Sequence, residues 1–134
     1  MNKAKPNRKR GCKMGKIRKD ELVVTSLLSE LLDDALEYYK IHLSDSSEST
    51  NVNDPFARAR SIITKLSDKD QEKIFNFLRI VIVDTMSAVF GTIDGTHFPP
   101  NISGDFMLEY DGEEIQGSLQ DELIAKAEEI GVYD

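Results

Sequence analysis

Cysteine, histidine and tryptophan are scarce in this sequence of 134 residues, which contains one, two and none of them respectively. Because Cys12 has no partner within the chain, an internal disulfide framework is excluded. His42 and His97 leave little material for histidine-based metal binding or acid–base catalysis. No apolar run approaches the roughly 20 residues that a transmembrane helix needs. We therefore expect neither a cystine scaffold nor contact with a membrane.

Sequence motifs of the common enzyme classes are also missing. The chain contains no Walker loop and no G-x-G-x-x-G, C-x-x-C, H-E-x-x-H or G-x-S-x-G pattern. One group of metal-ligand residue types, Asp94, His97, Asp105 and Glu109, flanks a loop, but its spacing follows no known ligand rule. We expect no enzyme, no catalytic residue, no metal and no bound cofactor.

The formal net charge of −7 conceals two blocks of opposite sign. Nine basic residues and no acidic residue lie in the first 19 positions, at Lys3, Lys5, Arg8, Lys9, Arg10, Lys13, Lys16, Arg18 and Lys19. Residues 20–134 then hold eight of the 17 basic residues against all 24 acidic ones, a net charge of −16. Because runs of one charge sign are usually disordered, we divide the chain into a disordered basic tail, residues 1–19, and a single acidic α-rich domain, residues 20–134.

The basic tail lacks the apolar stretch that follows the charges of a signal peptide, and we therefore expect a cytoplasmic protein. Met14 is a candidate internal start, and in that interpretation the residues before it are upstream or cloning-derived sequence. The tail has no aromatic residue on which a base could stack, so it supports only non-specific binding to phosphates.

Apolar residues at helical spacing predict four helices, with approximate bounds 20–43, 54–66, 67–93 and 118–130. The third is apolar on most of its circumference, which is typical of a helix at the centre of a domain. The second is expected to turn these side chains inward: Phe56, Ala59, Ile62, Ile63 and Leu66. Residues 44–53 lack a core-forming pattern and are predicted to be a flexible connector.

Capping residues mark the ends of these helices. Asp54 followed by Pro55 predicts the start of the second helix, because Asp is a strong N-cap and Pro is favoured at the first helical position. Ser67 and Ser118, each followed three residues later by an Asp, predict the starts of the third and fourth helices. Gly131 predicts the end of the last one.

Between the third and fourth helices, Asp111 and Gly112 interrupt alternating apolar residues, which is a strong signal for a β-hairpin. A two-residue turn at this point creates three cross-strand pairs: Leu108 with Ile115, Glu109 with Glu114, and Tyr110 with Glu113. The predicted fold is therefore α+β and mostly α. It has three N-terminal helices, including the long apolar central helix, then one β-hairpin and one C-terminal helix.

Asp84 lies within the apolar stretch of the predicted central helix. At helical spacing it shares a face with Phe77 and Val81, so we expect partial burial. A buried carboxylate needs a partner, and Arg58 or Arg60 of the second helix would make Asp84 a structural pin. An exposed position at the edge of the helix and a catalytic role are the two alternatives.

Acidic side chains gather in two places and are the candidate partner-binding residues. On the first helix, like charges at i, i+4 spacing each cost roughly 0.2–0.5 kcal/mol, and like charges also face each other across the hairpin. A basic partner would remove this repulsion. The predicted contact residues are Glu30, Asp33, Asp34, Glu37, Glu109, Asp111, Glu113 and Glu114, with Tyr38 and Tyr110 as aromatic anchors.

Small size, acidity and the lack of catalytic motifs favour a protein-interaction role with a basic protein as partner. The profile is similar to that of bacterial immunity proteins and antitoxins that neutralise basic nucleases, although no specific motif carries the similarity. The alternatives are a nucleic-acid accessory protein that uses residues 1–19, and an enzyme of unknown type that uses Asp84 or the loop after Asp94. An open hairpin edge also allows a homodimer.

Overall fold

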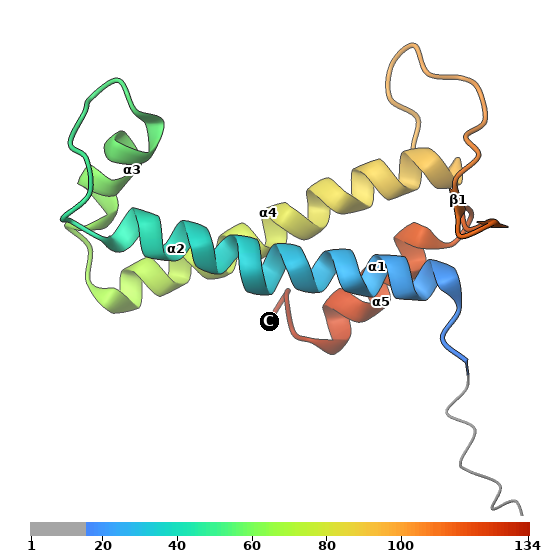
Figure 1. Ribbon diagram of the computed structural model, residues 1–134, viewed down its shortest axis with the longest axis horizontal. Helices are drawn as coiled ribbons and strands as arrows, with labels where there is room; N and C mark the ends of the chain where they lie inside the picture. The colour runs from blue at the N-terminus through green and yellow to red at the C-terminus, as the bar shows by residue number, and fades with distance from the viewer. Residues whose placement is uncertain (1–15) are drawn as a thin grey trace, which may run out of the picture.

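The computed structural model describes residues 16–134, which form a mostly helical protein with one antiparallel hairpin (Figure 1). This confirms the predicted mixture of several helices and one hairpin. The elements, in chain order, are α1 Lys19–Ser29, the π-helical segment η1 Glu30–Ala35, α2 Leu36–Ser44, α3 Pro55–Ile63, α4 Asp68–Asp94, β1 Glu109–Tyr110, β2 Glu113–Glu114 and α5 Leu119–Glu129.

Helices α1 and α2 and the π-helical segment between them form one continuous rod, in agreement with the predicted first helix (Figure 1). Four side chains spaced four residues apart are buried along it: Val24, Leu28, Leu32 and Leu36. An α-helix has 3.6 residues per turn, so a strict four-residue stripe drifts around its surface. The wider π-helix, with about 4.4 residues per turn, compensates this drift and keeps the stripe on the core. The π-helical segment differs from the single α-helix that the sequence predicts over residues 20–43.

Helix α4 crosses the rod and is the longest element of the described chain, with 27 residues. Ser67 caps it as predicted, because its hydroxyl accepts a hydrogen bond from the backbone N–H of Asp70 at 3.2 Å. The predicted end is also confirmed, since Gly95 follows in the left-handed conformation with φ 78°. Residues 80–83, four β-branched residues in a row, lie within the helix.

The main core lies where α1, α4 and α5 meet. Helix α5 packs against both α1 and the C-terminal half of α4, whereas α2 and the N-terminal half of α4 extend beyond it with α3 at their far end (Figure 1). The buried core residues from these three helices and from the segments beside α5 are Val24, Leu28, Val83, Met86, Phe90, Ile115, Leu119, Leu123, Ala127 and Val132. The molecule is therefore three helices thick at one end and thinner at the other.

The start of α5 corrects one prediction. The side chain of Ser118 makes no capping hydrogen bond. Instead, the carboxylate of Asp94, at the end of α4, accepts hydrogen bonds from the backbone N–H groups of Gly117 at 2.6 Å and Gln120 at 2.8 Å. The cap thus comes from another helix and joins the two elements. The predicted stop is confirmed, because Gly131 has φ 72°.

The buried face of α3 also differs from the prediction. Asp54 caps the helix as expected, but the inward residues are Ala57, Arg60 and Ile63, while Ile62 is 65% exposed. Of the other expected core residues, Phe56 is 37% exposed and stacks on the ring of Tyr39, and Ala59 and Leu66 are half-buried. Ile63 is buried as predicted, but the buried arginine within the stripe explains why the apolar pattern missed the rest of the buried face.

The hairpin has the predicted register, with Glu109 opposite Glu114 and Tyr110 opposite Glu113. Asp111 and Gly112 have φ values of 50° and 75°, as a two-residue turn of type I′ requires. Beyond the two strands, the backbone N–H of Ile115 donates to the carbonyl of Leu108, and the Ile115 side chain is buried in the core.

Candidate interaction surfaces

Four carboxylates on the outer side of the rod, Glu30, Asp33, Asp34 and Glu37, form a surface that we call the acidic ridge. All four are exposed, and the first three lie on the π-helical segment. Asp33 accepts a hydrogen bond from the hydroxyl of Ser29 at 2.9 Å. Within residues 16–134, no ion pair involves Glu30, Asp33 or Asp34.

One side of the acidic ridge borders cationic side chains. The ammonium of Lys40 lies 3.7 Å from the carboxylate of Glu37. Asp33 and Glu37 also line a shallow groove between the rod and α4, together with Lys40 and Arg79. The side chains of Glu30 and Asp34 are exposed and make no ion pair or hydrogen bond with another described residue, so these two carboxylates are the most available to a partner.

Tyr38 directly follows the acidic ridge and is 55% exposed. Its ring centroid lies 4.1 Å from that of His42 and 5.7 Å from that of Tyr39 in an edge-on arrangement. These neighbours restrict the ring without covering it. Tyr38 therefore lies beside the carboxylates with part of its ring exposed, and its role as an aromatic anchor stays a prediction.

The second acidic group, at the tip of the hairpin, already has a cation. Lys19 donates a hydrogen bond to the carbonyl of Asp111 at 2.9 Å. Its ammonium also lies 3.9 Å from the carboxylate of Asp111 and 4.0 Å from that of Glu113. Lys19 therefore relieves part of the repulsion at the tip, although Glu109 and Glu114 still face each other. The structure does not bring this group together with the acidic ridge, since it lies at the other end of α1 (Figure 1).

Tyr110 of the hairpin is 43% exposed and shares a small apolar hollow with Leu22 and Leu27 of α1. The hairpin is held to α1 through this side as well as through Lys19. Tyr110 thus contributes to packing, and only part of its ring is free to meet a partner.

The boundary of the basic tail also shifts. Arg18 forms ion pairs with Glu122 of α5 and with Asp20, and Lys19 is the first residue of α1. These two cations, assigned by sequence to the tail, therefore contact the acidic body. The prediction of a disordered arm otherwise falls on residues 1–15, which lie outside the described residues.

Asp84 does not form the expected pin. Its side chain is exposed, and it accepts a hydrogen bond from the hydroxyl of Tyr133 at 3.5 Å. Arg58 is exposed on α3, and Arg60 is bound to other groups. Helix α3 lies at one end of the molecule, whereas the chain terminus that Asp84 contacts lies near the middle, which is why the pairing does not form (Figure 1).

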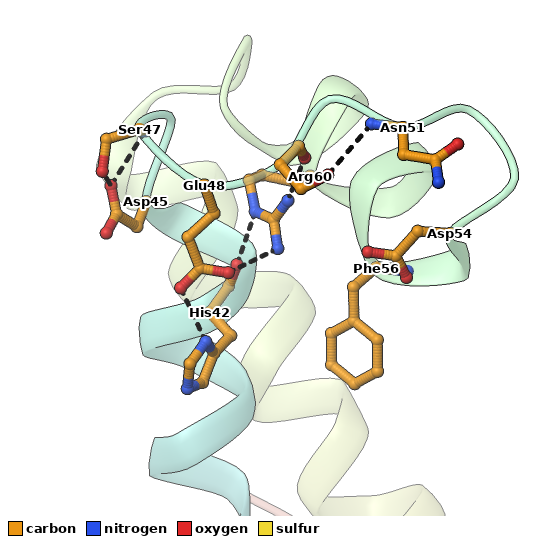
Figure 2. Close-up of polar contacts among 9 residues, drawn as sticks. His42, Asp45, Ser47, Glu48, Asn51, Asp54, Phe56 and Arg60 are labelled. Carbon is orange, nitrogen blue, oxygen red and sulfur yellow. Dashed lines mark hydrogen bonds and ion pairs between the residues drawn. The ribbon is translucent and has the colours of Figure 1, made fainter.

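Among residues 16–134, the buried charged side chain is that of Arg60, which is 5% exposed (Figure 2). Its guanidinium donates to the carbonyl of His42 at 2.6 Å, to the carbonyl of Ser49 at 2.8 Å and to the carboxylate of Glu48 at 2.8 Å. The other oxygen of Glu48 lies 2.6 Å from Nδ1 of His42. This cluster fastens the connector, residues 44–53, to α2 and α3. Each of the three guanidinium nitrogens donates one hydrogen bond, so the cluster is a structural clasp.

No three His, Cys, Asp or Glu side chains gather into a metal-binding group within residues 16–134. Asp94, the first member of the expected group, uses both carboxylate oxygens to cap α5. By length and composition α4 is apolar enough to cross a membrane, which corrects the expectation that no stretch approaches that length. The core helix of a soluble protein meets the same criteria, and Arg79 and Asp84 interrupt the apolar stretch.

Within the residues that the structure describes, the acidic ridge is therefore the candidate site. No family model matches the chain, and neither a curated protein nor a solved structure matches it. The function is consequently argued from the residues themselves.

Proposed function

We propose that this chain is a protein-binding protein that recognises a basic partner through the acidic ridge, with Glu30 and Asp34 at the centre of the contact and Tyr38 at its edge. The observation that carries this proposal is the π-helical segment under the ridge. Such segments are rare and are often found at functional sites. Here the segment presents three exposed carboxylates that no cation of the described chain neutralises.

Long-range electrostatics supports the same partner chemistry. The chain has a net charge of −7, and a negatively charged protein attracts basic proteins and repels nucleic acids and anionic lipids. The ridge would guide a basic protein towards one face and cover its cationic surface. In this proposal the chain neutralises or regulates its partner by occupying that surface, as an immunity protein or antitoxin does.

A nucleic-acid role for residues 1–19 remains a prediction, and the structure weakens part of it. Arg18 and Lys19 already bind Glu122 and the hairpin tip, so they are not available to phosphates without breaking these contacts.

The direct test is affinity capture from a lysate of the source organism with the full chain as bait, at low and at moderate salt. The ridge variant carries Glu30→Lys and Asp34→Lys. The matched control carries Asp105→Lys and Glu128→Lys, two exposed carboxylates outside the ridge, and so has the same net charge.

We expect one basic protein to be retained by the original chain in near-equal amount, to be released by salt, and to be lost from the ridge variant but kept by the control. Two results would contradict the proposal: retention that is equal for all three baits, or capture of no basic protein by the original chain.

A further inference from the structure

Helix α4 carries an apolar stripe on the side opposite its core-facing residues. We call this stripe the α4 seam, and its members are Ile74, Phe77, Val81, Thr85 and Ala88. All five are exposed, with Phe77 at 62% and Val81 at 42%. The hydroxyl of Thr85 donates to the carbonyl of Val81 at 2.7 Å, so that its hydrogen-bonding capacity is met within the helix. A stripe of this kind is typical of an interaction site.

The spacing of the seam is 3-4-4-3 and is therefore symmetric about Val81. If two copies of α4 pack antiparallel with Val81 on the two-fold axis, Phe77 of each copy lies opposite Thr85 of the other. Ile74 then lies opposite Ala88. Large side chains in the first half of the seam thus meet small ones in the second half, as close helix packing requires. A surface that is complementary to itself is the mark of a two-fold interface.

The total accessible surface points the same way. The chain exposes 10435 Å², whereas a monomeric protein of 15.1 kDa exposes about 7,100 Å². If residues 1–15 supplied as much surface as an unfolded chain, that share would be about 2,500 Å². Residues 16–134 would then still expose about 1,400 Å² more than a monomeric protein of their mass. A stable interface of standard size needs about 800 Å² from each partner.

We propose that the protein forms a homodimer in which the α4 seams of two copies pack antiparallel about Val81. Asp84 lies at the border of the seam beside Tyr133, where a charge disfavours other registers. This dimer differs from one formed at the hairpin edge, where each strand has only two residues and offers few backbone groups. The proposal does not depend on the acidic ridge, which lies on a different helix.

The symmetry makes a sharp test, because a cysteine on the two-fold axis faces its own copy. In a full chain with Cys12→Ser, the change Val81→Cys should give a disulfide-linked dimer in near-complete yield under mild oxidation. Ile62→Cys, on exposed α3, is the matched control and should remain largely monomeric.

Sedimentation velocity on chains without added cysteines gives a second measurement. The original chain should sediment at twice the monomer mass. Phe77→Glu should weaken association at least tenfold and so shift the protein towards the monomer. Ile62→Glu should leave the protein dimeric. A monomer at every concentration up to about 100 μM would overturn the proposal, and so would a dimer unaffected by Phe77→Glu. Flotation of the original chain with phosphatidylcholine vesicles, combined with a monomeric state in solution, would show a lipid surface as the occupant and would equally overturn it.

Discussion

Arg60 shows how one side chain organises a segment that has little hydrophobic packing of its own. The connector, residues 44–53, contributes no residue to the buried core, yet the Arg60 guanidinium holds it through Glu48 and Ser49. A planar fork can meet two carbonyls and a carboxylate at once, which a lysine ammonium cannot do in the same geometry. The connector conformation therefore depends on the arginine and not on positive charge alone.

Replacing Arg60 with Lys should lower the free energy of unfolding by about 1–3 kcal/mol, because the carbonyls of His42 and Ser49 lose the partly buried hydrogen bonds that the guanidinium donates. Arg58→Lys, at an exposed site on the same helix, should change it by less than about 0.5 kcal/mol. Urea denaturation of both variants measures the difference. Equal stability of the two variants would show that Arg60 acts only through its charge.

Tyr133 provides a residue-scale test in alkaline solution. Burial raises the pKa of its hydroxyl above 10.0, and the neighbouring Asp84 carboxylate raises it further. The folded protein then binds more protons than the unfolded chain above about pH 10, so its free energy of unfolding falls as the pH rises through the raised pKa. Asp84→Asn should bring the Tyr133 pKa closer to 10.0 and reduce that fall. Phenolate absorbance, compared between the original chain and Asp84→Asn, reports the pKa; an unchanged value would show that Asp84 does not contribute to the shift.

Single residues were also where sequence reasoning was least complete. The burial of Arg60 and the contact of Lys19 with the hairpin tip both depend on segments distant in sequence. For Arg60, the one sequence feature that could have indicated burial was its position three residues from both Ala57 and Ile63. Asp84 was expected to be buried from helical spacing alone, but spacing cannot tell which face of an all-round apolar helix a neighbour covers.

At the scale of elements, local chemistry predicted most boundaries. Asp54, Ser67, Gly131 and the Asp111–Gly112 turn act where the sequence placed them, because each works through its own backbone neighbourhood. The π-helical segment had a signal that was not used, namely four buried residues at strict four-residue spacing. No local sequence pattern could have predicted the cap of α5, since the capping carboxylate comes from the end of another helix.

That cap gives an element-scale prediction. Asp94→Ala should lower the free energy of unfolding by about 1–2 kcal/mol, because two backbone N–H groups at the start of α5 lose their acceptor. Ser118→Ala should have an effect below about 0.5 kcal/mol, since its hydroxyl makes no cap. Thermal or urea unfolding compares the pair. A larger loss for Ser118→Ala than for Asp94→Ala would contradict the observed cap.

At the scale of the whole molecule, charge and packing are separated. The three-helix end buries most of the core, whereas the rod carries the acidic ridge along its middle and the hairpin tip lies near its start (Figure 1). The sequence predicted both acidic groups, but not that Lys19 would compensate one and leave the other. Because Glu30 and Asp34 of the acidic ridge have no such cation within the described chain, the proposed partner binding is assigned to the ridge and not to the hairpin tip.

The most direct test of this account is the association rate of the captured basic protein, measured by stopped flow over a range of salt concentrations. Glu30→Lys with Asp34→Lys should lower the rate at low salt by about tenfold or more and flatten its salt dependence, because the ridge guides the encounter. Asp105→Lys with Glu128→Lys should have a much smaller effect. An unchanged rate in the ridge variant, or an equal loss in both, would contradict recognition through the acidic ridge.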